Sequence, residues 1–313
     1  MRHPERLHGD GRHRVTLFRT PSGSAKAVVC FEPGRDLMNG FETPHCPAFA
    51  ERLGVDALMV QTARRDWFLS RNNYKLANAL SRATAGYNDV TGSGFSMGGY
   101  GALLFSAAAR LRRVLLVSPQ YNIDPDIVTY DPDRANKFRR IGYAMPCPET
   151  LGDTALRGLL IYDPTIPADR GHAACVAKAF PKLRPVTLPF GGHPATSVIG
   201  DAKKVGRLST MLVDGKLNIR VVRRLHRDAR RQSDKYRLNL VRAAVVKHPA
   251  TAQTELHDLA RSGTPYVRFE AGIALVGLDE PLAVRMLTQL LADVPDPPPH
   301  WAGRMQEALD HAD

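Results

Sequence analysis

The stretch that decides the fold is GSGFSMGGYGAL, which spans residues 92–103. Within it, Gly94 to Gly98 form the pattern Gly-x-Ser-x-Gly, with Ser96 at the centre. An apolar run precedes this serine and a run rich in small residues follows it, so Ser96 is expected on a sharp turn between a strand and a helix. Such a turn is strained, and side chains at the flanking positions would collide with neighbouring backbone, which explains Gly94 and Gly98.

Segments of two kinds alternate on both sides of this turn. Short apolar runs, typical of strands buried on both faces, alternate with longer segments of helical character, which predicts a mostly parallel, doubly wound α/β sheet. The expected strands are Val15–Phe18, Ala27–Phe31, Ala57–Val60, Val90–Phe95, Val114–Val117, Gly158–Tyr162 and Pro185–Leu188. The expected helices are Pro47–Leu53, Asn73–Ala85, Gly98–Arg110, Ala173–Phe180 and Thr196–Leu208, with a small cap over residues 121–156.

The segment around Ser96 resembles the nucleophile elbow of the α/β-hydrolase superfamily, and the resemblance covers roughly residues 13–212. It implies a chain order of serine, then an acid after a later strand, then a histidine after the last strand. Asp163 directly follows the strand Gly158–Tyr162, and His193 follows the last strand in a Gly-Gly loop. The resemblance therefore implies the catalytic set Ser96, Asp163 and His193.

Other residues compete for two of these roles. Asp169, Asp124 and Asp126 are alternatives to Asp163, which is preferred because it lies directly at a strand end. His172 is an alternative to His193, but it precedes the last expected strand.

The implied chemistry is acyl transfer through the serine. A histidine is suited to take the serine's proton near neutral pH, and a carboxylate orients its imidazole and stabilises the charged form. The backbone N–H of Met97 is expected as one donor to the oxyanion. The second donor is expected in the loop after Ala27–Phe31, with Glu32 and Gly34 as candidates, since Pro33 has no N–H.

Motifs for other chemistries are weaker. Position 97 is Met, so Gly92-x-Gly94 lacks the third glycine of a dinucleotide fingerprint, and the sequence has neither a Walker lysine nor an HExxH motif. We therefore expect no cofactor and no metal. Trp67, Phe68 and Tyr74 follow an expected strand end, where they either line a substrate pocket or belong to the core and its helix cap.

The pattern changes near residue 213. No further strand runs occur, and apolar residues at helical spacing with proline punctuation predict six or so short helices, of which Tyr266–Val276 and Pro281–Leu291 form the clearest pair. These helices resemble a short helical-repeat array, with a plain helical bundle as the alternative. The expected domains are an α/β-hydrolase catalytic domain, 1–212, and an all-α domain, 213–313.

Charge and cysteine usage bear on partners and compartment. The formal net charge is +12, and residues 201–247 hold 14 Lys/Arg against 4 Asp/Glu, which suits either an anionic partner or a solvated helix face. Nucleic-acid binding is not expected, since this basic stretch carries no known nucleic-acid-binding motif. The charged N-terminus is unlike a secretory signal, no apolar run is long enough to cross a membrane, and the four cysteines are widely spaced, which favours the cytoplasm.

These observations favour a serine hydrolase that cleaves a carboxylic ester, an esterase or deacylase, acting on a small-molecule or glycan ester. One alternative is an acyltransferase on a glycan or small acceptor, which shares the acyl-serine intermediate. Another is a catalytically dormant hydrolase fold that binds a protein partner through residues 213–313, because a fold does not guarantee an activity.

Overall fold

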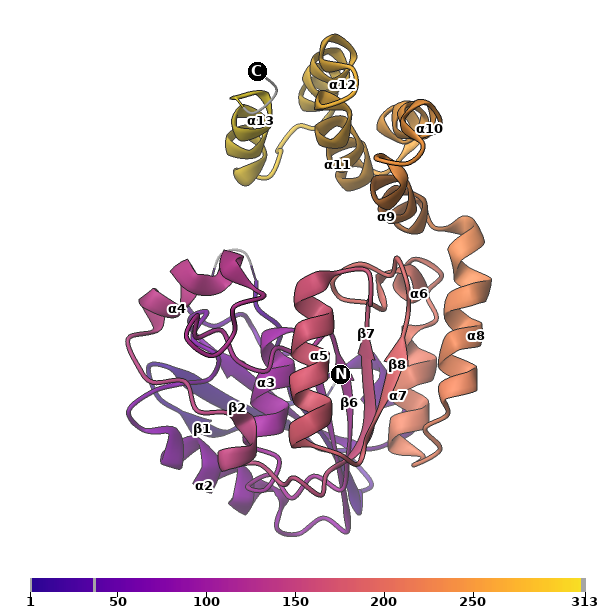
Figure 1. Cartoon of the computed structure of the whole chain (residues 1–313). Helices are drawn as coiled ribbons and strands as arrows, with labels where there is room; N and C mark the ends of the chain where they lie inside the picture. The colour runs from indigo at the N-terminus through magenta and orange to yellow at the C-terminus, as the bar shows by residue number, and fades with distance from the viewer. Residues whose placement is uncertain (1, 36–37, 311–313) are drawn as a thin grey trace. The chain divides into compact units, whose positions relative to one another are not determined.

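The computed structural model describes residues 2–35 and 38–310, and its chain divides into two compact units, residues 1–227 and 228–313. The first unit is built on one eight-stranded sheet with helices on both faces (Figure 1). Its strands are β1 (Pro4–Gly9), β2 (His13–Phe18), β3 (Lys26–Phe31), β4 (Asp56–Thr62), β5 (Asp89–Phe95), β6 (Arg113–Val117), β7 (Arg157–Tyr162) and β8 (Leu183–Thr187).

The strand order is β1-β2-β4-β3-β5-β6-β7-β8. β2 pairs antiparallel with both β1 and β4, and all other neighbours are parallel, from β4 through to β8. The expected α/β sheet and all seven expected strands are therefore confirmed. β1 is an addition, since its burial is low and its sequence PERLHG carries no apolar run from which a strand could be predicted.

Alternate side chains of each strand feed two separate cores, as the pleat of a β-strand requires. In β6, Val114 and Leu116 belong to the core beneath α2, α3 and α5, whereas Leu115 and Val117 belong to the core beneath α6, α7 and α8. The helices of this unit are α1 (Ala48–Leu53), α2 (Asn73–Thr84), α3 (Met97–Leu104), α4 (Ala135–Ile141), α5 (Pro167–Ala179), α6 (Ser197–Asp201), α7 (Val205–Val213) and α8 (Ile219–Ala229).

The helix expected over Thr196–Leu208 and the expected domain boundary both differ from the structure. The helix expected over Thr196–Leu208 is divided into α6 and α7 at Lys203, whose backbone is left-handed with φ 56°. The expected start of the all-α domain at residue 213 is too early, because Val222 of α8 is fully buried in the sheet core with Leu208 and Leu212. Helix α8 thus belongs largely to the first unit, which runs to Arg227.

The second unit is helical throughout its described residues. Its core is continuous from Leu238 to Trp301, where Trp301 stacks on Phe269 with ring centroids 4.3 Å apart. The expected pair of helices is present, and Gly272 lies so close to Leu287 that a methyl group there would contact it. The helices are α9 (Asp234–Ala244), α10 (Pro249–Ser262), α11 (Pro265–Val276), α12 (Glu280–Asp293) and α13 (His300–Asp310).

Candidate active site

Ser96 lies between β5 and α3, on the turn expected from the sequence. Its backbone has φ 51° and ψ −120°, a conformation that is strained for a residue with a side chain and is typical of functional sites. The flanking glycines are required by space: a Cβ on Gly94 would lie 2.3 Å from the carbonyl oxygen of Gly98, and one on Gly98 would lie 2.4 Å from that of Phe31. The turn thus needs both glycines of the Gly-x-Ser-x-Gly pattern.

His193 reaches Ser96 from the loop after β8. The Ser96 hydroxyl lies 2.9 Å from Nε2 of His193, and Nδ1 of the same ring lies 2.8 Å from Oδ1 of Asp169. A carboxylate only accepts, so Nδ1–H donates to Asp169, and the lone pair of Nε2 is left to accept the Ser96 hydroxyl. The side chain of His193 is 28% exposed, whereas that of Asp169 is 4% exposed.

The acid facing His193 is therefore Asp169, and the prediction of Asp163 is corrected. Asp163 does follow β7, but its carboxylate accepts from the backbone N–H of Phe190 at 3.2 Å and of Gly192 at 2.8 Å. It also accepts from the backbone and hydroxyl of Thr165. Asp163 thus holds the loop that carries His193, and its oxygens are turned toward that backbone.

A signal in the sequence could have identified Asp169. Helix α5 begins at Pro167, six residues before the expected start at Ala173, and proline is favoured at the first position of a helix. Asp169 consequently lies in the first turn of α5, at the same edge of the sheet as Ser96. The partial positive charge at a helix N-terminus stabilises a carboxylate there.

The histidine and the two aspartates that also competed for these roles fall outside this arrangement. His172 is buried one turn further along α5, where Nε2 lies 2.8 Å from Asp131 and Nδ1 accepts from the backbone N–H of Tyr121. Burial raises the pKa of Asp131, but the hydrogen bond from His172 and the charge of Arg134 outweigh it, and the pKa is lowered. The backbone N–H of Asp126 donates to Asp124 within a local turn.

The structure distinguishes between the two candidates for the second oxyanion donor. The N–H of Glu32 donates to the carbonyl of Val60 at 3.0 Å, so it is not available to a substrate. Gly34 stays the candidate, together with Met97, which is the first residue of α3 and whose N–H has no acceptor within the helix.

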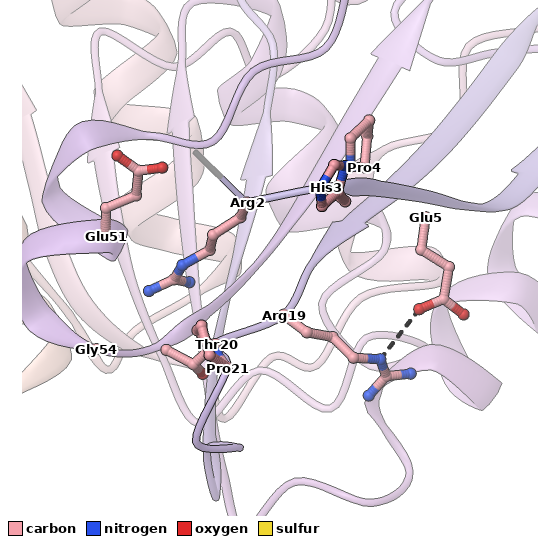
Figure 2. A pocket seen from close by; sticks show the side chains of 9 residues that line it. All are labelled: Arg2, His3, Pro4, Glu5, Arg19, Thr20, Pro21, Glu51 and Gly54. Carbon is pink, nitrogen blue, oxygen red and sulfur yellow. Dashed lines mark hydrogen bonds and ion pairs between the residues drawn. The ribbon is translucent and has the colours of Figure 1, made fainter.

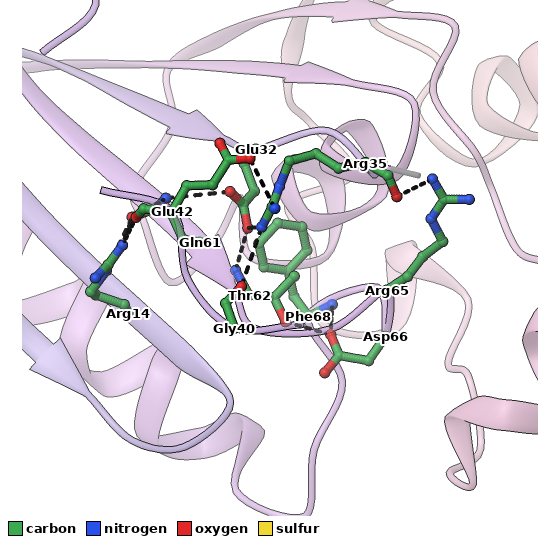
Figure 3. Close-up of polar contacts among 10 residues, drawn as sticks. All are labelled: Arg14, Glu32, Arg35, Gly40, Glu42, Gln61, Thr62, Arg65, Asp66 and Phe68. Carbon is green, nitrogen blue, oxygen red and sulfur yellow. Dashed lines mark hydrogen bonds and ion pairs between the residues drawn. The ribbon is translucent and has the colours of Figure 1, made fainter. Parts of the chain in front are cut away.

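Two buried carboxylates, Glu32 and Asp66, are linked through Thr62 near the ends of β3 and β4 (Figure 3). Glu32 accepts from the backbone N–H of Thr62 at 2.8 Å, and the hydroxyl of Thr62 donates to Asp66 at 2.6 Å. Burial raises the pKa of Glu32, and it raises the pKa of Asp66 to about 6. Asp66 also accepts from the N–H of Phe68, which fixes a turn in which Trp67 and Phe68 both have positive φ.

Of the three residues considered for a substrate pocket, two belong to the core. Trp67 and Phe68 are 1% and 0% exposed and belong to the core, whereas Tyr74 is 60% exposed at the start of α2. Trp67 instead contributes a buried hydrogen bond, from Nε1 to the side-chain oxygen of Gln120 at 2.6 Å, and the N–H of Gln120 donates to the carbonyl of Ser96. The turn after β4 is thereby linked to the backbone of Ser96.

A cavity of about 690 Å³ lies away from this site, where β1 begins and β2 ends (Figure 2). Its lining makes local contacts: Nε of Arg19 lies 3.0 Å from a Glu5 oxygen, and Arg2 donates to the carbonyls of Ala50 and Val55. Nothing in this lining resembles the arrangement around Ser96.

The strand order, the helices on both faces and the turn at Ser96 define an α/β-hydrolase fold. No family model matches the sequence, and no curated protein matches it. Among solved structures, the chain is similar to Est1E from Butyrivibrio proteoclasticus, with 15% identity, 66% of this chain and 98% of that chain covered, and a TM-score of 0.42.

Two further similarities have the same character. One is to a hormone-sensitive lipase from a metagenome library, at 12% identity, 68% and 86% coverage and a TM-score of 0.48. The other is to the capsule O-acetyltransferase of Neisseria meningitidis serogroup A, at 14% identity, 67% and 94% coverage and a TM-score of 0.46. At such identities, these similarities say nothing about the substrate of this chain. Within the described residues, no helix is both long and apolar enough to cross a membrane.

Proposed function

We propose that the protein is a serine hydrolase that cleaves a carboxylic ester through an acyl-Ser96 intermediate. The observation that carries the proposal is the continuous contact from the Ser96 hydroxyl through the ring of His193 to Asp169, at 2.9 and 2.8 Å. These distances suit a hydroxyl whose proton is taken by an imidazole that a carboxylate orients.

The proposed reaction has two balanced halves. Oγ of Ser96 attacks the ester carbonyl carbon while its proton passes to Nε2 of His193, and the N–H groups of Met97 and Gly34 stabilise the oxyanion. The tetrahedral intermediate then expels the alcohol, which takes the proton from His193. Water repeats the sequence on the acyl enzyme and releases the carboxylic acid and free Ser96. Asp169 keeps Nδ1 protonated and stabilises the imidazolium throughout.

A fluorophosphonate probe tests the proposal, because it labels only activated serines. We expect labelling of the full-length protein, loss of labelling in Ser96→Ala, and strong reduction in His193→Ala and Asp169→Asn. Ser22→Ala, at an exposed serine outside the site, is the matched control and should label like the wild type. A folded protein that takes no label would contradict the proposal and favour a binding role.

The same intermediate allows transfer to an acceptor in place of water. Acyl-enzyme formed from an aryl acetate distinguishes the two outcomes, because an acceptor alcohol or glycan accelerates its breakdown and captures the acyl group. Breakdown that is insensitive to such acceptors and yields only free acid supports hydrolysis.

A further inference from the structure

A group of cations gathers at the edge of the sheet opposite Ser96. The strands β5 to β8 are parallel, so their amino ends share one edge and Ser96 lies at the other. Two adjoining cavities, of about 810 and 660 Å³, open at the amino ends and share Arg112 and Arg157. The cations that line one or both are Arg110, Arg112, Arg113, Arg157, Lys182 and Arg184.

Among the described residues, these six cations face two carboxylates, Asp153, which lines the larger cavity, and Asp89, so most of the positive charge is not neutralised. Arg113 forms two hydrogen bonds with the carboxylate of Asp89, at 2.9 and 2.7 Å. Arg112 and Arg184 each donate to a backbone carbonyl, of Asn88 and Leu217, which fixes a guanidinium without cancelling its charge. Within the described residues, no carboxylate lines the smaller cavity, and Arg157 and Lys182 have no ion pair.

The register of the strands brings these cations together. Arg113 and Arg157 are direct partners in β6 and β7, and Gly158 pairs with Leu183, so Lys182 and Arg184 lie beside the start of β7. Neighbouring strands are about 4.8 Å apart, so cations from three strands converge within roughly 10 Å. Like charges held this close repel one another unless an anion lies between them.

Arg110 lines the larger cavity as well. Its left-handed backbone, with φ 51°, has a local cause, because it ends the helical turn that follows α3, where the N–H of Leu111 donates to the carbonyl of Ser106 at 3.0 Å. Arg110 therefore adds a further positive charge to the lining.

We propose that this edge binds a small ligand that carries two or more phosphate groups. Guanidinium groups present forked donors that match phosphate oxygens, and the cluster supplies several of them from different strands. A cavity of this volume suits a small molecule, whereas a polymer would be bound by an extended surface. The site lies at the opposite edge from Ser96, so it is separate from ester cleavage and does not rest on the function proposed above.

Calorimetric titration of the full-length protein with inorganic tripolyphosphate tests this site. We expect saturable binding whose affinity falls as the salt concentration rises. The affinity should also decrease in the order tripolyphosphate, pyrophosphate, sulfate. Arg157→Ala/Lys182→Ala should weaken it about tenfold or more, the order expected for lost charge-assisted bonds to phosphate. The control Arg220→Ala/Arg223→Ala removes the same charge from the exposed face of α8 and should change binding less than about twofold.

Three results would overturn the proposal. One is an equal loss in the cluster variant and the control variant, which would mean a general effect of net charge. Another is the absence of saturable binding of tripolyphosphate to a folded protein. The third is single-stranded DNA binding more tightly than tripolyphosphate through Arg157 and Lys182, which would assign the edge to nucleic acid. Circular dichroism checks that both double variants are folded. Arg157→Gln alone provides a milder second test.

Discussion

The carboxylate that faces His193 belongs to Asp169, in the first turn of α5, and the carboxylate of Asp163, at the end of β7, makes different contacts. Asp169 contacts the imidazole, whereas Asp163 binds the backbone of the loop that delivers it. The two aspartates are six residues apart, and their roles follow from what each oxygen accepts. In the proposed reaction, Asp169 orients the imidazole of His193, and Asp163 fixes the backbone of the loop that carries His193.

Substitution by asparagine should separate these roles. Asp169→Asn should lower kcat by a factor on the order of 10³ to 10⁴, because an amide no longer keeps Nδ1 of His193 protonated, with little change in stability. Asp163→Asn should lower the free energy of unfolding by about 1–3 kcal/mol through the weakened bonds to Phe190 and Gly192, with a smaller effect on kcat. Aryl ester turnover and chemical denaturation measure both; the reverse pattern would restore Asp163 as the catalytic acid.

At the scale of elements, the ends of neighbouring strands are tied together around Ser96. Thr62 is the last residue of β4 and Asp66 follows this strand, Glu32 follows β3, and Gln120 follows β6. Hydrogen bonds join Glu32 to Thr62, Thr62 to Asp66, and Trp67 to Gln120. The strained turn at Trp67 and Phe68 is thus held on one side by a carboxylate and on the other by an amide.

Trp67→Phe tests the part of this link that reaches Ser96. The ring stays in the core, but the oxygen of Gln120 loses its buried donor, so the free energy of unfolding should fall by about 1–3 kcal/mol. The rate of fluorophosphonate labelling should also fall, because the backbone N–H of Gln120 donates to the carbonyl of Ser96. Leu69→Ala, a core truncation on the same turn, is the control; an equal loss of labelling at equal destabilisation would show that only stability matters.

Two buried groups on neighbouring strand ends should give opposite pH dependences of stability. Burial lowers the pKa of His13 to about 4, and both ring nitrogens lack a hydrogen-bond partner among the described residues. The unfolded state therefore binds more protons between pH 4 and 6.5, and stability is lost as the pH falls through this range. Burial raises the pKa of Asp66 to about 6, so the folded state binds more protons, and stability is lost as the pH rises from about 4 to 6.

The two slopes oppose each other in the wild-type protein, and single substitutions should expose each one. In His13→Phe, the free energy of unfolding should decrease as the pH rises from about 4 to 6, whereas in Asp66→Asn it should increase as the pH rises from about 4 to 6.5. Each change is on the order of 3 kcal/mol, from the size of the pKa shifts. Denaturant midpoints measured across this pH range provide the check, and parallel profiles for the two variants would contradict the assignment.

For the whole molecule, the position of the boundary between the two units decides which of them α8 stabilises. Helix α8 buries Val222 in the sheet core, and Nε2 of His226 lies 3.0 Å from the carbonyl of Pro189, just before the loop of His193. The helix therefore supports both the fold of the first unit and the segment that carries His193. Whether the helices of the second unit form true repeats stays a hypothesis.

Two truncations should reveal the contribution of α8. The fragment of residues 1–227 should unfold at a Tm close to that of the first unit in the full chain, and it should keep its labelling by fluorophosphonate. Residues 1–212 should lose about 3 kcal/mol or more, roughly 6–12 °C in Tm, because the core around Leu208 and Leu212 becomes exposed. Calorimetry of both fragments measures the difference; equal stability would return the boundary to residue 213.

The sequence by itself determined the α/β sheet and the turn at Ser96, and the resemblance to α/β-hydrolases indicated His193. The sheet and the turn follow from local patterns, because buried strands are apolar runs and the turn needs Gly94 and Gly98. The tertiary structure decided which aspartate faces His193, that Glu32 gives its N–H to Val60, and that Trp67 and Phe68 belong to the core. It also decided that α8 packs on the sheet and that cations from separate strands form one cluster. These properties depend on contacts between residues far apart in the chain. Pro167 marks the start of α5 and so indicates where Asp169 lies along the chain, but only the fold brings Asp169 to His193.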